Sequence, residues 1–266
     1  MAEQMNHIAS LFGNWPETII WSCLEGTMGQ VYVDDSQSPQ SALALYGRQS
    51  FFVFLAGQPH RDLLKICEGK DMILVPQNQN WSDLIEGTYG DGIRSFTRYA
   101  TKKDTEFDLG HLQKLVDDLP ESFDMKRIDH NLYEACLVEE WSRDLVGNYI
   151  DVEQFLDLGL GYVILHKGQV VSGASSYASY SAGIEIEVDT REDYRGLGLA
   201  KACAAQLILA CLDCGLYPSW DAHTLTSLKL AEQLGYQLDK PYRAHEWRKD
   251  DTDIYLVFGR NTVGSL

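Results

Sequence analysis

The sequence predicts an α/β (α+β) fold, because segments typical of strands alternate with segments typical of helices along its 266 residues. Short runs rich in β-branched and aromatic residues predict the strands, and longer runs with apolar residues every three or four positions predict the helices. Hydrophobic residues make up 45% of the chain and charged residues 23%, which is typical of a globular protein. The length allows one large domain or two smaller ones.

In the first half, short apolar runs are separated by turn residues. They predict strands at Thr18–Leu24, Gly29–Val33, Ser50–Ala56 and Met72–Val75. Short helices are predicted at His60–Cys67 and Leu109–Leu119, and Pro120 marks a boundary after the second. We therefore expect an N-terminal α/β lobe of unknown role at residues 1–120 and a second domain at residues 121–266.

The second half has a tighter pattern, and Lys167-Gly168 suits a hairpin turn that needs positive φ angles. The predicted strands are Asp124–Ile128, Gly161–Leu165, Val170–Tyr177, Ile184–Thr190, Tyr217–Ala222 and Ile254–Phe258. The predicted helices are Glu139–Val146, Val152–Leu158, a long apolar helix that follows Ala200 and ends near Gly215, and Leu225–Leu234. The α/β alternation thus continues to the end of the chain.

The charge balance is acidic, with 22 Lys and Arg against 39 Asp and Glu and a net charge of −17. Such a surface repels phosphate groups, so a nucleic-acid binder and a protein that docks on anionic lipid are both disfavoured. The same balance favours a cationic small substrate, although many acidic proteins carry their charge for solubility alone.

The cellular compartment is expected to be the cytoplasm. No signal peptide is visible at the N-terminus, and no apolar run approaches the length of a membrane helix. The six cysteines are scattered, which favours free thiols. Cys211 and Cys214 form a C-x-x-C at the end of a helical segment, where core packing is the simpler interpretation, and we expect no metal.

The most informative segment is a strand, a glycine turn and a helix, EIEVDT-REDY-RGLGLA-KACAAQLI. Gly196 and Gly198 let the backbone approach a ligand closely, and the helix that follows presents free N–H groups and its positive dipole end. This predicts a pyrophosphate site. The G-x-x-x-x-G-K-[ST] of a nucleotide P-loop is absent, and Lys201 stands where the third glycine of a dinucleotide-binding turn would fall.

Arg195, Gly198 and Ala200 form R-x-x-G-x-A, which resembles the Q/R-x-x-G-x-G/A signature of the GNAT acyltransferase superfamily. The segment WDAHTLTSLKLAEQLGY (Trp220–Tyr236) is similar to the second motif of that family. Together the two segments resemble the zwittermicin A resistance-like branch over about Asp189–Trp247. The resemblance implies the GNAT fold, a mixed and mostly antiparallel sheet flanked by helices. The additional N-terminal α/β lobe is a separate hypothesis with two alternatives, a degenerate GNAT-like lobe or a cover that recognises the substrate. Because that lobe has no such signature, we expect it to bind no coenzyme A.

The resemblance also implies that acetyl-CoA is the co-substrate. The backbone amides from Gly196 to Lys201 would bind its pyrophosphate, Val188–Thr190 would pair with the pantetheine amides, and the next strand would splay away to admit it. Thr224 stands where many members carry Asn. The expected cofactor-binding residues are Val188, Asp189, Thr190, Arg195, Gly196, Leu197, Gly198, Leu199, Ala200, Lys201, Thr224 and Ser227.

The candidate catalytic residues are Glu185 and Glu187, which alternate onto one face of the strand before the glycine turn. Either carboxylate would take the proton of an attacking amine, directly or through water. The alternative is that both are exposed on the sheet face or paired with basic residues. A backbone N–H near Thr190 would stabilise the oxyanion.

The candidate substrate-binding residues are Asp221, which would attract a cationic amine or else cap the next helix, and His223, which is more often structural. The frequent general-acid Tyr of the family falls on Ala231, so a Tyr-dependent mechanism is not expected. Tyr236, Tyr242 and His223 remain as substitutes.

The implied function is acetyl-CoA-dependent N-acetyl transfer to a primary amine of a small cationic acceptor. Two alternatives stay open: a coenzyme A-binding regulator without catalysis, and an acyltransferase acting on a macromolecular amine or with another acyl group. The expected partner is a small amine, with no nucleic acid and no membrane, and the expected state is a monomer or homodimer. The acidic residues near the predicted site further suggest a positive cofactor mouth and a negative acceptor mouth.

Overall fold

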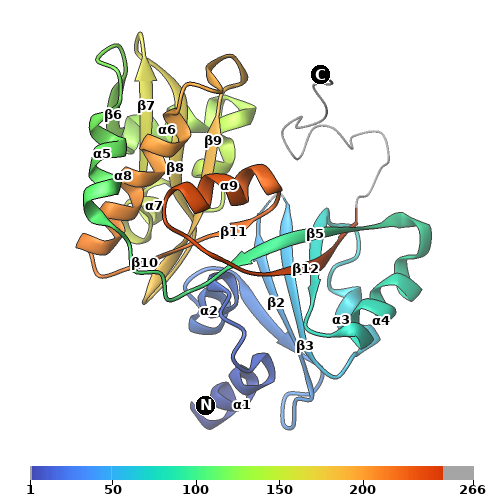
Figure 1. Cartoon of the computed structure of the whole chain (residues 1–266). Coiled ribbons are helices and arrows are strands. Elements are labelled where there is room, and N and C mark those ends of the chain that lie inside the picture. Colours follow the sequence, from blue (N-terminus) through green and yellow to red (C-terminus); the bar gives the residue numbers. More distant parts are fainter. Residues whose placement is uncertain (1, 49, 248–266) are drawn as a thin grey trace. The chain divides into compact units, whose positions relative to one another are not determined.

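The structure is a computed structural model that describes residues 2–48 and 50–247 (Figure 1). The chain divides into two compact units. Of the described residues, unit 1 takes 2–15, 29–48, 50–96 and 243–247, and unit 2 takes Pro16–Met28 and Thr97–Tyr242. The predicted strand at 254–258 lies outside the described residues. The predicted domain boundary at residue 120 stays a prediction.

Unit 1 is built on an antiparallel meander that continues into a parallel pair. Strands β1, β2 and β3 pair antiparallel, β3 pairs parallel with β4, and the end of β12 pairs antiparallel with β4. The elements are α1 (Ala2–Phe12), β1 (Gln30–Val33), β2 (Ser41–Gly47), β3 (Phe51–Gly57), α3 (Arg61–Lys65), β4 (Met72–Pro76), α4 (Gln79–Tyr89), the 3₁₀ turn η1 (Gly90–Gly92), the start of β5 (Ile93–Thr101) and the end of β12 (Leu238–Trp247). Its core packs Leu43, Val53, Leu74 and Trp81 together.

Unit 2 contains a five-stranded sheet in the order β10-β9-β8-β7-β6. All neighbours pair antiparallel except β9 and β10, which are parallel, so the predicted mixed and mostly antiparallel sheet is confirmed. The strands are β6 (Asp124–Arg127), β7 (Gly161–His166), β8 (Gln169–Tyr180), β9 (Gly183–Thr190) and β10 (Tyr217–Ser219), and the short β11 (Asp221–Ala222) pairs with the end of β5.

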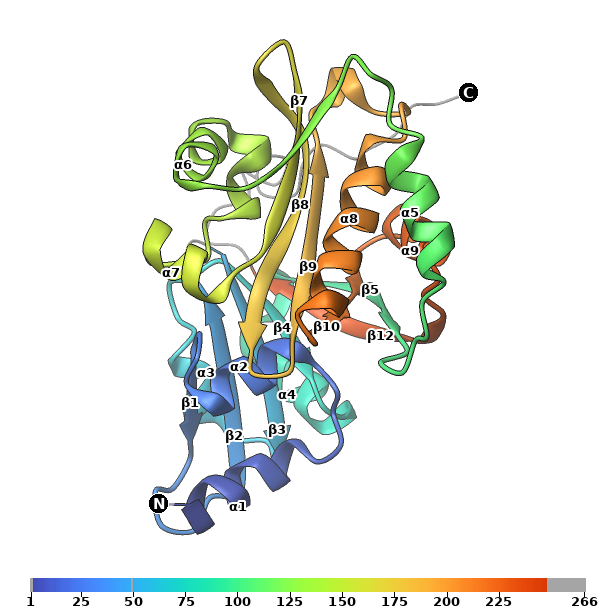
Figure 2. The same cartoon turned by 90° about the vertical axis from the view of Figure 1, so that its left-hand side faces the viewer.

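Helices cover both faces of the unit 2 sheet, and Figure 2 shows α8 and α5 on one side of it and α6 and α7 on the other. The apolar α8 packs on β7, β8 and β9, and α5 packs on α8. The helical elements of the unit are α2 (Thr18–Glu25), α5 (Leu109–Asp117), α6 (His130–Val138), the 3₁₀ helix η2 (Glu140–Leu145), α7 (Val152–Leu158), the 3₁₀ turn η3 (Glu192–Tyr194), α8 (Leu199–Asp213) and α9 (Leu225–Gln233). Within the described ranges, no helix is long and apolar enough to span a membrane.

The prediction of a strand at Thr18–Leu24 was wrong, because this segment forms helix α2. Its residues are buried on several sides, from Thr18 to Cys23, so the sequence shows neither a period of two nor a helical stripe. A short run with β-branched residues then resembles a strand. The helix ends at Gly26, whose φ of 71° is the left-handed conformation of a helix C-terminus.

Other predictions differ in detail. The predicted helix at Glu139–Val146 is the 3₁₀ helix η2, and the predicted strand at Tyr217–Ala222 divides at Trp220 into β10 and β11. The hairpin turn is confirmed, with φ angles of 52° at Lys167 and 80° at Gly168.

Candidate active site

The parallel pair formed by β9 and β10 opens immediately before the glycine turn. Ser219 pairs with Glu185, and in the described part of the chain the two strands are not paired beyond that level. On the other side of β9 the register to β8 shifts between Ser176 and Ala178, which leaves Tyr177 as the bulged residue at the same level. The predicted separation of the two strands is therefore present, and the bulge lies on β8.

Along its open edge, β9 pairs with no strand in the described part of the chain beyond the level of Glu185. The Arg191 N–H donates to the Val171 carbonyl of β8 (3.0 Å). Backbone groups of successive residues in a strand point to opposite edges, so those of Val188 and Thr190 point away from β8, to the edge on which β10 has already ended. The Thr190 N–H donates to the Asp189 carboxylate (2.6 Å). The amide predicted to stabilise an oxyanion thus already has an acceptor within its own strand.

The glycine turn leads directly into α8. Gly196 and Gly198 have φ angles of 77° and 81°, and a Cβ added at either one meets no described atom within 4 Å. The space over the turn is therefore open. Gly198 is the N-cap of α8 and supplies no side-chain acceptor to the first turn of the helix. The N–H groups at the start of α8 are available to an anion.

The flanks of the turn are held by side chains. The Arg195 Nε donates to the Thr190 carbonyl (3.2 Å), and the Thr190 hydroxyl lies 2.7 Å from the Ser172 hydroxyl. Tyr194 places its hydroxyl 2.7 Å from the His166 Nδ1, and the Arg191 guanidinium lies 4.5 Å above its ring. These contacts fix the turn to β7, β8 and β9.

Side chains at the start of α8 divide between core and surface. Leu199 is buried in the core, whereas Leu197 is 55% exposed. Lys201 donates to the Gln233 amide oxygen (3.2 Å). Ala200 is partly buried.

Strand β9 presents an acidic face. Ile184, Ile186 and Val188 belong to the core that packs around α8, so Glu185, Glu187 and Asp189 occupy the other face, as predicted. The interpretation that these carboxylates are exposed is wrong for Glu185, which is 6% exposed, while Glu187 and Asp189 are partly buried.

Burial raises the pKa values of the carboxyl groups of Glu187 and Asp189 on this face. Burial raises the pKa of Glu187 well above its ordinary value, and the carboxylates of Asp144 and Asp189 raise it further. Burial also raises the pKa of Asp189 to about 6, although its bond from the Thr190 N–H and the charge of Arg195 act against this.

Asp221 lies in a buried ion pair with Arg98, a residue that sequence reasoning missed. The Asp221 Oδ1 accepts from the Arg98 Nε (2.7 Å) and from the Tyr242 hydroxyl (2.9 Å), while Asp221 Oδ2 is buried and has no partner among the described residues. The Arg98 Nη1 lies 3.1 Å from the His223 Nδ1. Burial opposes the charge of Arg98, but Asp221 and Tyr242 more than offset this and raise its pKa.

Two further charged residues, which sequence reasoning also missed, surround Glu185. The Lys103 ammonium donates to the Ser219 hydroxyl (2.6 Å), and the charges of Glu17, Glu185 and Asp221 raise its pKa despite burial. Burial raises the pKa of Glu17 to about 7, and Lys103 acts against this rise. Residues 17, 98, 103, 185 and 221 come from four separate segments, since 98 and 103 lie at the end of β5 and just after it, so no local pattern marks them as a group.

The remaining predicted residues have local roles in the structure. Thr224 caps α9 by accepting from the Ser227 N–H (3.1 Å), and the Ser227 hydroxyl accepts from the Trp220 indole N–H (3.1 Å). Thr224, rather than Asp221, is thus the cap of this helix. Tyr236 donates to the Pro218 carbonyl (2.5 Å), and Ala231 is buried in the core.

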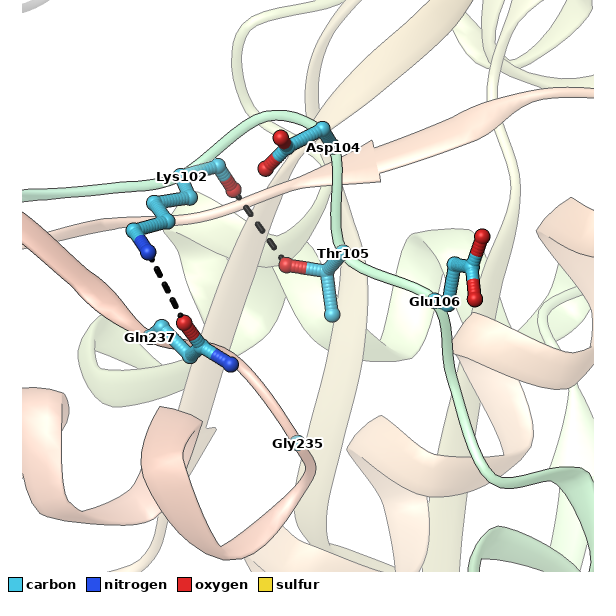
Figure 3. A pocket seen from close by; sticks show the side chains of 6 residues that line it. All are labelled: Lys102, Asp104, Thr105, Glu106, Gly235 and Gln237. Atoms are coloured by element: carbon cyan, nitrogen blue, oxygen red, sulfur yellow. Dashed lines mark hydrogen bonds between the residues drawn. The ribbon is translucent and has the colours of Figure 1, made fainter.

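A surface pocket of about 300 Å³ lies beside the end of α9. Its lining is polar, and Figure 3 shows the Lys102 ammonium bonded to the Gln237 amide oxygen (3.0 Å) and the Thr105 hydroxyl bonded to the Lys102 carbonyl (3.3 Å). The lining residues are Lys102, Asp104, Thr105, Glu106, Gly235 and Gln237. None of the predicted site residues lines it.

A parallel strand pair that opens beside a glycine turn and a helix N-terminus, on a mixed sheet, is the arrangement of a GCN5-related acyltransferase. The chain belongs to the GNAT acetyltransferase family, whose sequence profile matches residues 9–245. It is therefore an acyltransferase of the N-acetyltransferase class.

Individual relatives agree with this assignment. The chain is 29% identical over 244 residues to the uncharacterized N-acetyltransferase YdfB of Bacillus subtilis (strain 168), covering 85% of this chain and 88% of that one. A crystal structure of a GCN5-related N-acetyltransferase-like protein from Streptococcus suis 89/1591 superposes with a TM-score of 0.91 at 90% identity, covering 93% of this chain and 100% of that one. A tandem GNAT protein from the clavulanic acid biosynthesis pathway shares the fold alone, with a TM-score of 0.51 at 12% identity, over 91% of this chain and 97% of that one.

The Arg98–Asp221 pair predicts a large effect on stability. Arg98→Met should lower the free energy of unfolding by about 3–5 kcal/mol, because it leaves a buried carboxylate without its cation. Denaturant-induced unfolding measures this. Arg243→Met is the matched control, since both side chains of its pair with Glu86 are exposed (54% and 42%) and its loss should leave the free energy of unfolding nearly unchanged. Equal effects of the two variants would contradict the structural role assigned to Arg98.

Proposed function

We propose that this chain transfers the acetyl group of acetyl-CoA to a primary amine of a small cationic acceptor. The observation that carries the proposal is the separation of β9 from β10 beside the open glycine turn, with an acidic face on the same strand. The resemblance to the zwittermicin A resistance-like branch is part of the same proposal. A cytoplasmic location is also proposed, and it is supported by the six cysteines, all of which are free thiols.

The residues present fit a coenzyme A pyrophosphate. An open turn with two positive-φ glycines admits the phosphates to the backbone, and the N–H groups from Gly196 to Lys201 face them at the positive end of the α8 dipole. Arg195 and Lys201 add positive charge on either side. The backbone of Val188 lies on the open edge of β9, where pantetheine amides would pair as a further strand does. The Thr190 N–H and carbonyl on the same edge are bonded to the Asp189 carboxylate and the Arg195 Nε, which pantetheine would have to displace.

Acetyl-CoA, when bound, supplies a thioester whose carbonyl carbon accepts the amine nitrogen while its C–S bond breaks. The protein contributes mainly by holding the two substrates together, which alone accounts for a large part of such rate enhancements. A thiolate is a good leaving group and needs little protonation, so the alanine at position 231 is compatible with this chemistry.

We assign the base that takes the proton of the amine to Glu187 and the counter-ion of the amine to Glu185. The carboxylates of Asp144 and Asp189 increase the proton affinity of Glu187, and its partial exposure lets it return the proton to solvent. Burial raises the pKa of Glu185, and the charge of Lys103 acts against this rise and supports the ionised form. Burial and interaction with Asp221 raise the pKa of Tyr242, which favours its neutral form.

We further propose that unit 1 contains a degenerate GNAT-like lobe without cofactor binding. Its order β1-β2-β3-α3-β4-α4 repeats the order β7-β8-β9-α8-β10-α9 of unit 2, and in both the third and fourth strands pair parallel. The likeness to a tandem GNAT protein supports this at the level of the fold. The corresponding helix α3 has only 5 residues, and no R-x-x-G-x-G/A signature precedes it.

A screen of amine acceptors tests the proposed function. Release of free thiol from acetyl-CoA should rise with at least one small primary amine and stay at background with its tertiary-amine analogue, and the product should carry one added acetyl group by mass. Release with propionyl-CoA alone, or with a peptide N-terminus alone, would instead favour another acyl group or a macromolecular amine. No release with any of these acceptors would contradict the proposal.

A further inference from the structure

Glu17 is a buried carboxylate that the family signatures do not mark. It precedes α2 as the N-cap residue, but its side chain makes no capping hydrogen bond. The residue is 6% exposed, which is unusual for an acid at a helix N-terminus. Its carboxylate therefore interacts with other groups of unit 2, and those are Arg98, Lys103, Glu185 and Asp221.

The carboxylates of this group have unused hydrogen-bonding capacity. Neither oxygen of Glu185 makes a well-formed hydrogen bond among the described residues. Burial raises the pKa of this carboxyl, and the charge of Lys103 acts against the rise. Oδ2 of Asp221 is likewise buried without a partner in the described chain. Buried acceptors of this kind are rarely left unsatisfied, and a water, an ion or a ligand usually completes them.

The cations of the group are already engaged and are too few. The Arg98 guanidinium bonds Asp221, Tyr242 and His223, and the Lys103 ammonium bonds the Ser219 hydroxyl. Three carboxylates thus face two cations, and one negative charge is left over. Burial raises the pKa of Glu17 to about 7 and also raises the pKa of Glu185, so a proton shared within this group compensates the charge in the free protein.

The position of the group relates it to the transfer point. Glu185 and Ser219 form the last paired level of β9 and β10, beyond which the strands open. Under the proposed function the acyl group lies at this opening. A positive group held by Glu185 is then placed next to it.

We propose that Glu17, Glu185 and Asp221 together bind the primary ammonium group of the acceptor, with Glu17 as a specificity-determining residue supplied by the segment before α2. An ammonium carries one positive charge and three donors. It matches the one unneutralised carboxylate and the buried oxygens of Glu185 and Asp221 that have no partner among the described residues. Entry of the cation displaces the proton from Glu17. The inference deepens the proposed function and rests on it for the identity of the acceptor, but ammonium binding itself is measured without acetyl-CoA.

Binding of methylammonium to the full chain tests the proposal, with tetramethylammonium chloride and sodium chloride at equal concentrations as ionic controls. Methylammonium should stabilise the wild type against heat more than either control salt does. The effect should be larger at about pH 8 than at about pH 6, on either side of the pKa of Glu17, because the site must lose its proton. The groups that face Glu17 and contribute to this dependence are Arg98, Lys103, Glu185, Asp221 and Tyr242.

The variants separate this site from a general charge effect. Glu17→Gln should weaken the apparent affinity for methylammonium by about tenfold or more, the scale of one lost charge-assisted contact. Glu185→Gln should do the same, and it carries the test should Glu17→Gln fail to fold. Glu134→Gln, at an exposed position of α6, removes the same charge and should leave the affinity unchanged.

Three outcomes would overturn the proposal: equal stabilisation by all three salts, no stabilisation, or equal affinity in the wild type and the folded Glu17 variant. A positive methylammonium result without any thiol release from acetyl-CoA would leave the site standing and reject the acetyl-transfer function. Thiol release without a methylammonium effect would reject the site alone.

Discussion

Gly198→Val should abolish acetyl-CoA binding, with an affinity at least about 100-fold weaker, which corresponds to about 2.7 kcal/mol. Gly198 has a φ of 81° and open space over its Cα, so a valine meets no clash in the free protein but occupies the approach to the α8 amides. The branched side chain also disfavours the left-handed conformation. Titration calorimetry with coenzyme A measures the loss.

Gly215→Val is the matched control for the strain. Gly215 has a φ of 73° and equally open surroundings, but it follows the other end of α8. The two variants should lose similar unfolding free energy, whereas only Gly198→Val should lose affinity. Wild-type protein at 100 times the dissociation constant should gain about 2.7 kcal/mol from the ligand, and the Gly198 variant should gain nothing measurable. Unchanged affinity in Gly198→Val would refute the pyrophosphate loop.

Glu187→Gln should lower kcat by about 100-fold or more near neutral pH, the usual contribution of a general base, with little change in the KM for the amine. The wild-type rate should rise with pH as Glu187 loses its proton, and the variant should lack this rise. The difference in kcat between the wild type and Glu187→Gln should become smaller at high pH, where the amine loses its proton to solvent without a base. Glu185→Gln should instead raise the KM for the amine, because it removes a counter-ion.

Glu187→Gln should also be more stable against unfolding than the wild type at neutral pH. The unfolded chain ionises Glu187 near its ordinary pKa of 4.5, whereas the folded protein does so only at higher pH. Between these two pH values the unfolded state holds fewer protons, so the stability of the wild type falls as pH rises. Glutamine has no such penalty. Lower activity together with lower stability would indicate a structural role for Glu187 and contradict its assignment as the base.

Sequence reasoning predicted the parts of the site that are local in the chain. The strand that carries Glu185 and Glu187, the turn at Gly196 and Gly198, and the helix after it follow one another within about thirty residues, and each has its own pattern. The separation of β9 from β10 was expected from the resemblance, and the structure contains it. A contiguous motif is predictable because backbone geometry alone fixes it.

The charged group around Glu185 was not predictable in this way. Arg98 and Asp221 are 123 positions apart, and Glu17 directly precedes a segment whose apolar residues predicted a strand instead of α2. Only tertiary packing brings these residues together, so neither spacing nor periodicity announces them. The strand prediction for Thr18–Leu24 failed for the same reason, because packing of this segment against β8 and β9 determines which of its residues are buried.

A crystal structure with coenzyme A bound tests the central claim most directly. The claim predicts the pyrophosphate on the backbone amides from Gly196 to Lys201 and the pantetheine along Val188–Thr190, with its thiol directed toward the level of Glu185 and Ser219. Coenzyme A bound elsewhere on the chain, with β9 and β10 free of it, would contradict the claim.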